Sequence, residues 1–368
     1  MRIGQFVTGG IVILTFVVGQ VYAQDSALFD SQSNAWKLYY QDPETSIWVS
    51  ETYVQQNAIK PSIHSVVQPH GGQYEYRYRV TNRRDAKQEI DTFRIWGIPL
   101  VYAVPNLPPV TSDMRTDMDG WTKQNWVQLK AKRTFERSVV KAPKGWSAGL
   151  RVDEKVGHTS FVWTPGLKEG DPNGIPPGRK QDGFVVYRPE LPGVARAKLT
   201  GATEEPWGLD GLPETPFWTA KIEEIQDRDY VLVPVLAPII PVPDPYSGPE
   251  LARRIRSHVQ TWVKYGHVNA DVLVRLNRQF DVLIPALELN NMQGARAAVQ
   301  AIRMELADRH PGLDDGRIEE DDDAFDAPAM ARNHGREAAV AAGPVDRVAA
   351  RALAFDLRYL LRRMDSGR

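Results

Sequence analysis

The clearest pattern in the chain is a strict alternation of apolar and polar residues at positions 74–81. Every second residue from Tyr74 to Val80 is apolar, and charged or polar residues stand between them. This period of two puts the apolar side chains on one face of a β-strand. A polar turn follows, and Ile90 and Phe93 begin a returning strand whose change of phase predicts a β-bulge.

Short strands of similar composition recur through the first two thirds of the chain. Nine of the ten tryptophans lie before residue 231, among turns that are rich in Pro and Gly. Further strands are expected at 36–40, 48–53, 126–129, 160–163, 184–187 and 194–199. Short strands without helical periodicity between them predict an antiparallel, immunoglobulin-like β-sandwich over residues 24–232.

The next segment, residues 233–249, is rich in proline. Its prolines are Pro234, Pro238, Pro241, Pro243, Pro245 and Pro249. Because repeated proline is incompatible with a helix interior or a central strand, we expect an extended linker and a domain boundary here.

Helical periodicity begins after this segment and continues almost to the end of the chain. Ser247 and Glu250 form a capping box, which predicts that a helix starts there. Apolar residues at spacings of three and four follow at 251–262, 273–287, 295–306 and 353–361, and Pro285 is expected to kink or end the second helix. The chain is therefore expected to be an α+β protein of two domains, with a C-terminal α-helical bundle over residues 250–368.

The helical part also contains a weak internal repeat. Gly266 and Val268 lead into one helix, and Gly343 and Val345 lead into another, with the matched residues 77 positions apart. Two unrelated amphipathic helices can match in this way by chance, so the duplication stays open.

The same residues carry a resemblance to a known family. The run from Gly266 through the Asn290-Asn291 turn to the alanines 295 and 298, together with the leucines of 353–361, resembles the small helical module called FIMAH, which occurs near the C-termini of secreted bacterial proteins. The chain departs from that pattern by an acidic loop before the last helix and an extension after it. The resemblance implies a secreted, non-catalytic accessory module.

The first 23 residues have the composition of a secretory signal. Arg2 precedes an apolar run at 11–18, and the small residue Ala23 marks the expected cleavage site. The alternative is an uncleaved membrane anchor, although this run is shorter than a spanning helix needs. We expect an exported bacterial protein, periplasmic or extracellular, with no membrane span after cleavage.

Composition narrows the range of chemistry. The chain has no cysteine, so it can form neither disulfides nor thiolate sites. The formal net charge of -1 gives no reason to expect nucleic acid as a partner. The last helix nevertheless gathers arginines, which can complement the helix dipole or pair with the acidic loop: Arg347, Arg351, Arg358, Arg362 and Arg363.

One motif suggests an enzyme. Gly145-Trp146-Ser147-Ala148-Gly149 has the spacing of a hydrolase nucleophile elbow. An elbow needs a buried strand before the serine and a helix after it, whereas residues 141–144 are polar or proline-containing and 150–153 alternate like a strand. We therefore expect a β-turn anchored by Trp146, and no catalytic residue.

Metal and cofactor sites are not expected either. His64 and His70 form the one histidine pair with plausible ligand spacing. The acidic loop 314–326 lacks the first and third ligands of an EF-hand, so calcium binding there stays an alternative to a solvated loop. No cofactor is predicted.

The aromatic residues suggest a binding role. Most are expected in the core of the sandwich, but Trp121, Trp207 and Trp218 stand in segments rich in Gly and Pro, where they could be exposed to a ligand. The preferred function is non-enzymatic binding or assembly with an envelope or extracellular protein. The alternatives are a polysaccharide-binding accessory protein and a serine hydrolase using Ser147.

Overall fold

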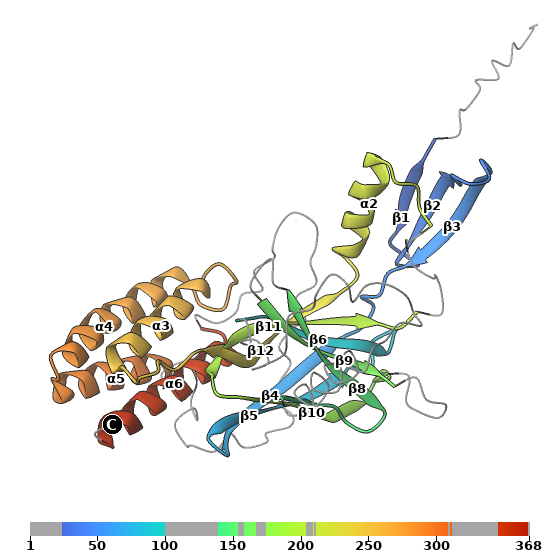
Figure 1. Cartoon of the computed structure of the whole chain (residues 1–368). Helices are drawn as coiled ribbons and strands as arrows, with labels where there is room; N and C mark the ends of the chain where they lie inside the picture. Colours follow the sequence, from blue (N-terminus) through green and yellow to red (C-terminus); the bar gives the residue numbers. More distant parts are fainter. Residues whose placement is uncertain are drawn as a thin grey trace, which may run out of the picture. The chain divides into compact units, whose positions relative to one another are not determined.

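The computed structural model describes residues 24–99, 139–153, 158–166, 174–203, 209, 211–307, 310 and 345–366. The protein is α+β, with antiparallel sheets and five helices in these described ranges (Figure 1). It divides into two compact units, one made of residues Met1–Val54 and Glu205–Ile222 and the other of Gln55–Glu204 and Glu223–Arg368. This division differs from the expected one, in which the boundary lay at 233–249.

The first unit is a small sheet covered by a helix. Its strands, in the order β1-β2-β3, are β1 (Ser26–Asp30), β2 (Ala35–Gln41) and β3 (Trp48–Val54). The strands expected at 36–40 and 48–53 are thus confirmed. Trp36, Leu38 and Tyr40 of β2 are buried on one face, together with Trp218 of helix α2 (Pro216–Gln226). The edge of Trp218 packs against Tyr40 with ring centroids 5.9 Å apart.

The second unit contains two larger antiparallel sheets. The four-stranded sheet has the order β4-β5-β10-β7, and the five-stranded sheet has the order β12-β11-β6-β9-β8. Their bounds are β4 Pro61–His70, β5 Gln73–Asn82, β6 Ile90–Pro99, β7 Val140–Lys141, β8 Trp146–Asp153, β9 His158–Pro165, β10 Lys180–Arg188, β11 Leu191–Gly201 and β12 Val231–Ile240. The strands expected at 160–163, 184–187 and 194–199 lie within β9, β10 and β11, while 126–129 lies outside the described residues.

Aromatic side chains join the two sheets into a sandwich. Tyr76, Tyr78 and Val80 of β5 all point into the core. The alternation predicted that they share one face of the strand, and the structure shows that this face is the buried one. Tyr78 contacts Phe93 of β6 across the sandwich at 5.8 Å between ring centroids, and Phe93 stacks on Trp163 of β9 at 4.7 Å. A cluster of aromatic rings thus lies between the two sheets, among the aliphatic side chains of the core.

The strand that follows β5 does not return beside it. β6 pairs with β11 and β9 in the other sheet, so the turn after β5 crosses from one sheet to the other. The predicted bulge is confirmed, because Thr200 pairs with Thr92 while the next residue, Gly201, pairs with Ile90.

The proline-rich segment is not a linker over its first part. Residues Val231–Ile240 form β12, which pairs with β11 only and is therefore an edge strand of its sheet. Proline lacks an N–H group, but an edge strand needs donors on one side alone, so Pro234 and Pro238 are tolerated there. The expected absence of a central strand agrees with this position at the edge, but the expected linker is a strand over residues Val231–Ile240.

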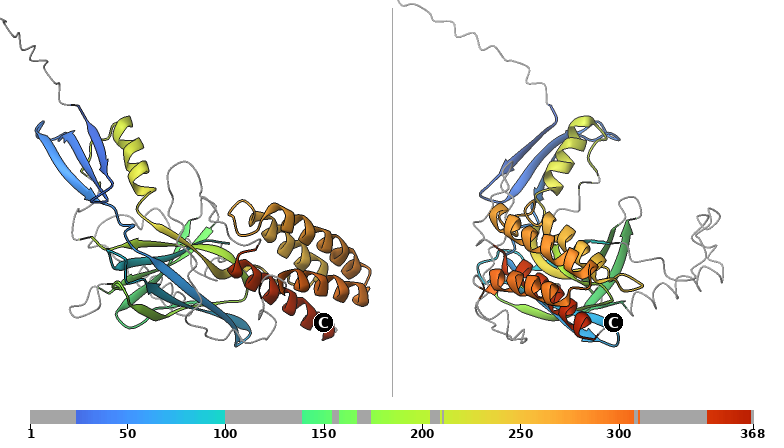
Figure 2. Two further views of the ribbon diagram at one scale, coloured as in Figure 1. Left: turned by 180° about the vertical axis from the view of Figure 1, so that it is seen from behind. Right: turned by 90° about the vertical axis from the view of Figure 1, so that its left-hand side faces the viewer.

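Helices α3 (Gly248–Thr261), α4 (Ala270–Glu288), α5 (Met292–Ala307) and α6 (Arg347–Asp365) confirm the predicted helical segments, and they pack against one another (Figure 2). Ser247 Oγ accepts from Glu250 N–H, as the capping box predicted. Pro285 lies inside α4 without ending it. The two sheets of the second unit and helices α3 to α6 share one continuous core. No helix in the described ranges is long and apolar enough to cross a membrane.

The internal repeat has a structural counterpart. Val268 and Val345, which are 77 positions apart, form an isolated antiparallel β-bridge. The residues that follow them, Asn269 and Asp346, are the N-caps of α4 and α6. The two helix starts therefore pair with each other through two valines that also match in the sequence repeat.

Candidate functional site

Ser147 does not stand in a nucleophile elbow. It is the second residue of β8, it is exposed, and it pairs with Thr164 of the neighbouring strand β9. β8 continues to Asp153, so a strand and not a helix follows the serine directly. The β-turn expected at Trp146 is confirmed, because the N–H of Trp146 donates to the carbonyl of Pro143 at 3.1 Å and closes a turn just before β8.

Of the three tryptophans proposed as ligand contacts, the structure describes one. Trp121 and Trp207 lie outside the described residues. Trp218 is fully buried in α2, and its Nε1–H donates to Asp25 Oδ2 at 3.0 Å. A buried indole whose N–H is already satisfied cannot stack on a ligand, so Trp218 is corrected to a core residue.

The predicted histidine pair lies on one strand. His64 and His70 both belong to β4, and the described residues contain no group of three or more His, Asp or Glu side chains that could hold a metal ion. The acidic loop 314–326 and the expected signal at 1–23 fall outside the described residues.

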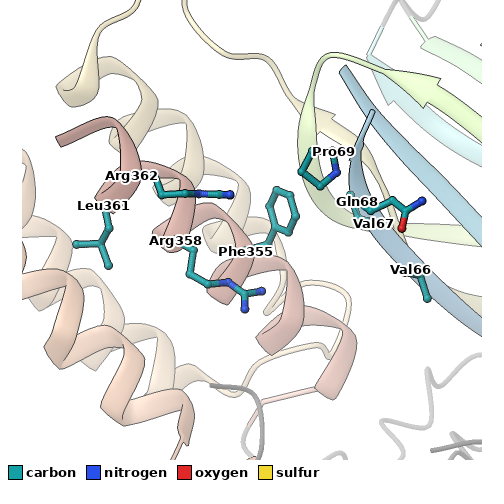
Figure 3. Close-up of a pocket in the computed structure, with 8 residues that line it drawn as sticks. All are labelled: Val66, Val67, Gln68, Pro69, Phe355, Arg358, Leu361 and Arg362. Atoms are coloured by element: carbon teal, nitrogen blue, oxygen red, sulfur yellow. The ribbon is translucent and has the colours of Figure 1, made fainter. Parts of the chain in front are cut away.

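The candidate site is a groove between the end of β4 and helix α6, with a volume of about 600 Å³ (Figure 3). Four consecutive residues of β4 line one side and four residues of α6 line the other: Val66, Val67, Gln68, Pro69, Phe355, Arg358, Leu361 and Arg362. We call these eight residues the β4–α6 groove. Phe355 and Arg362 extend from α6 toward Pro69.

Helical periodicity explains the α6 wall. Arg358 and Arg362 are four residues apart, which places their side chains on the same side of a helix, one turn apart, and Phe355 lies three residues before Arg358. The opposite stripe of α6, which includes Leu353, Leu357 and Leu360, is fully buried in the core. The buried stripe fixes the helix so that the arginines face the groove.

Two contacts attach α6 to the sheet beside the groove. The guanidinium of Arg351 donates to the backbone carbonyl of Ser65 at 2.7 Å, and the rings of Phe355 and Tyr74 meet edge to face with centroids 5.4 Å apart. Burial, with a smaller effect of the charge on Arg347, lowers the pKa of Arg351 to about 10. The carbonyl of Ser65 points away from β5, which shows that the free edge of β4 faces α6.

A buried carboxyl lies on α6 close to the same contact. Asp356 is 1% exposed, and its Oδ1 has no hydrogen-bond partner. Burial raises its pKa well above the ordinary value of an aspartate. Burial therefore favours the neutral form of this carboxyl over the charged form.

The charged side chains in the lining of the groove are Arg358 and Arg362. None of its eight lining residues is acidic. The next residue, Arg363, is turned elsewhere and stacks on the ring of Tyr246 at 4.2 Å. Two guanidinium groups beside Phe355, Pro69 and Val67 suit a ligand that combines a carboxylate or phosphate with an apolar group.

The sequence indicated only one side of this site. The arginines of the last helix were visible as a cluster, but β4 was not predicted as a full strand, and nothing in the pattern places residues 66–69 beside residues 355–362. No local signal could have found the groove, because its walls are nearly 300 residues apart in the chain.

Comparisons with known proteins identify no family. No protein-family model matches the chain, and no curated protein matches it. Among solved structures, the chain is similar to an uncharacterized protein from Nocardia farcinica, described as having an immunoglobulin-like fold, at 15% identity and a TM-score of 0.21. That similarity covers 40% of this chain and 86% of the other.

Proposed function

We propose that this chain is an exported, non-enzymatic binding protein of the cell envelope or extracellular space, and that the β4–α6 groove binds an acidic segment of a partner protein. The observation that carries the proposal is the pair of arginines one helical turn apart, Arg358 and Arg362, set against an apolar wall with no carboxylate among the lining residues. Export rests on the composition of residues 1–23.

The chemistry of the groove favours an acidic peptide segment with an apolar residue. Arginine forks match carboxylates in geometry and charge, and such hydrogen bonds are about twice as strong as neutral ones. Phe355, Pro69 and Val67 offer an apolar surface for a side chain next to the carboxylates. The volume of about 600 Å³ lies within the usual range for a small ligand or a few residues of peptide.

Binding fits these residues better than catalysis does. The eight lining residues include no serine, histidine or carboxylate, so they offer no pair of nucleophile and base. Gln68 is already engaged, because its Nε2–H donates to Glu75 Oε2 at 2.5 Å. We keep two finer hypotheses within this proposal: the sandwich is immunoglobulin-like, and the helical part is an accessory module of the FIMAH type.

Fluorescence anisotropy with defined peptides tests the proposal. The first probe is a pentapeptide with phenylalanine between two pairs of glutamates, and the second has glutamines in place of the glutamates. We expect the full-length protein to bind the first probe and not the second. Arg358→Ala and Arg362→Ala should each weaken binding about tenfold, the usual worth of one charge-assisted hydrogen bond.

Arg278→Ala is the matched control, since Arg278 is an exposed helical arginine on α4 that does not line the groove. It should bind the acidic probe as the wild type does. Equal losses in the control and the groove variants would mean that the probe responds to overall charge, and the proposal would then be wrong.

A further inference from the structure

The open face of the first unit carries a second candidate surface, which is independent of the groove. On one face of the sheet β1-β2-β3, the side chains of Trp36, Leu38 and Tyr40 are buried. On the other face, Leu28, Tyr39 and Trp48 are 60%, 37% and 43% exposed. Large aromatic side chains on an open sheet face require an explanation, because a core would have buried them.

The strand register places the two rings next to each other. Tyr39 of β2 pairs with Ser50 of β3. Gln41, two residues later on β2, pairs with Trp48, which is two residues earlier on β3. Tyr39 and Trp48 are therefore diagonal neighbours on adjacent strands, at a spacing of about 7–8 Å that side chains of this size can bridge. The two residues are thus an exposed aromatic pair on one face of the sheet, which we call the Tyr39–Trp48 platform.

Hydroxyl and amide groups surround this platform. Tyr39 has Ser26 directly across on β1 and Ser50 directly across on β3, so a serine stands on each side of the ring. Gln41 stands across from Trp48, and Thr52 stands across from Lys37 on the same face. This surface has an apolar centre and polar groups on its rim. A surface that packs against the apolar surface of another protein would instead be continuously apolar.

The charge of the face is balanced. Lys37 lies on this face because it is two residues from Tyr39 on β2, and Asp30 lies on it because it is two residues from Leu28 on β1. The two side chains carry opposite charges. Neither a strongly anionic nor a strongly cationic ligand is favoured. The ligand that fits is neutral, has flat apolar faces and carries hydroxyl groups around its rim.

The hairpin that carries the platform is held in place before any ligand binds. The turn between β2 and β3 is closed by the N–H of Asp42, which donates to the carbonyl of Ile47 at 2.9 Å. Asp42 Oδ1 also accepts from the N–H groups of Glu44 and Thr45, at 2.7 and 2.9 Å. A rigid support lowers the entropic cost of binding.

We infer that the Tyr39–Trp48 platform binds a neutral polysaccharide, whose sugar rings stack on the two aromatic rings while their hydroxyls bond to Ser26, Ser50 and Gln41. A pyranose ring has an apolar face made of C–H groups and a rim of hydroxyls, which is the complement of this surface. The inference does not depend on the β4–α6 groove, and either site can be present without the other.

Affinity electrophoresis of the full-length protein tests this inference. The native gels contain hydroxyethylcellulose, dextran, polygalacturonate or no polysaccharide. We expect the protein to be retarded in at least one of the two neutral gels. Its retardation in the polygalacturonate gel should not exceed that in the neutral gel. Tyr39→Ala and Trp48→Ala should each weaken retention roughly 2- to 10-fold, and the double variant should migrate as in the empty gel.

Phe217→Ala is the control, because Phe217 is an exposed aromatic residue of the same unit that lies on α2 and not on the platform. Circular dichroism melts of each variant establish that loss of retention is not loss of folding. Absence of retardation in both neutral gels overturns the inference. So does a wild-type dimer in size-exclusion chromatography that both platform variants convert to monomer, since the face would then be a self-association surface.

Discussion

At the scale of single residues, the hydrogen bond that His258 makes requires one protonation state of its ring. Its Nε2 accepts the backbone N–H of Val194 at 2.9 Å, which attaches helix α3 to strand β11. Burial, with a smaller effect of His267, lowers the pKa of His258 to about 4. The folded protein therefore requires a neutral imidazole, since a protonated Nε2 could not accept this hydrogen bond.

This depressed pKa makes stability depend on pH in a defined window. The unfolded chain binds a proton at His258 below about pH 6.5, whereas the folded chain does so only below about pH 4. The contribution of His258 to the free energy of unfolding is thus complete above pH 6.5 and is lost as the pH falls toward 4. We expect a loss of roughly 3 kcal/mol over this window.

Urea unfolding of the wild type and of His258→Gln at several pH values checks this. Glutamine can accept the hydrogen bond from Val194 but does not titrate, so the difference between the two proteins should shrink as the pH falls from 6.5 to 4. A difference that is constant over this window would show that His258 titrates normally in the folded state.

The close approach of His258 to strand β11 leaves no room for a side chain at Gly193. A Cβ atom added to Gly193 would lie 2.5 Å from His258 Nε2 and 2.6 Å from Ile239 Cβ. Gly193→Ala should therefore lower the free energy of unfolding by about 1–3 kcal/mol through overpacking. Gly149→Ala is the control in another strand of the same sheet, because nothing lies within 4 Å of its added Cβ. Equal effects of the two substitutions would contradict the close approach of His258.

At the scale of elements, α4 and α6 start in equivalent ways. Asn269 Oδ1 accepts from Val272 N–H, and Asp346 Oδ1 accepts from Val348 N–H. Asp346 also contacts His267 Nδ1 at 3.1 Å, so its side chain ties the start of α6 to the residues before α4. The two helix starts and the bridge between Val268 and Val345 form one paired structure.

Removal of either cap should therefore destabilise the helical part. Asn269→Ala is expected to cost about 1 kcal/mol, and Asp346→Ala at least as much because it also loses the contact with His267. Ser257→Ala, at an exposed position inside α3, should change stability by less than about 0.5 kcal/mol. Chemical denaturation measures all three, and a neutral Asp346→Ala would be incompatible with this role of the cap.

Local patterns identified the elements that have a clear period or a clear start. The alternation at Tyr74–Val80 and the caps at Ser247 and Glu250 are local signals, and each produced the expected element. The prolines at 234 and 238 exclude a central strand, as predicted, but the extended linker inferred from them is in fact the edge strand β12.

The errors at the candidate sites have similar causes. Trp218 was expected in a loop because Pro and Gly surround it, but Pro216 instead begins a helix, and Thr215 Oγ1 accepts from the N–H of Trp218 at 3.3 Å. The exposed pair Tyr39 and Trp48 could not be distinguished from core aromatics, since alternation does not reveal which face of a sheet is covered.

At the scale of the whole molecule, two distant segments build the first unit. Residues 26–54 form its sheet, and Trp218 comes to it from α2, more than 160 residues later in the chain. The hydrogen bond from Trp218 Nε1–H to Asp25 Oδ2 joins the two segments. Sequence patterns predict neither this pairing nor the strand order of the larger sheets, because both depend on contacts between residues far apart in the chain.

Trp218→Ala should therefore unfold or loosen the first unit alone. Truncating a buried tryptophan costs about 3–5 kcal/mol, which is a large part of the stability of so small a sheet. Hydrogen exchange should accelerate at β1–β3, while the amides of β5, β10 and β11 keep their protection. Uniform acceleration in both sets of strands would contradict the division into two units.

The central claim is that the β4–α6 groove is the binding site of this protein. Hydrogen exchange of the full-length protein, with and without the glutamate–phenylalanine pentapeptide, tests it most directly because it locates the bound peptide on the chain. We predict protection at residues 66–69 and 355–362 that disappears in the Arg358→Ala/Arg362→Ala double variant. Binding of the peptide with protection confined to other segments would contradict the account.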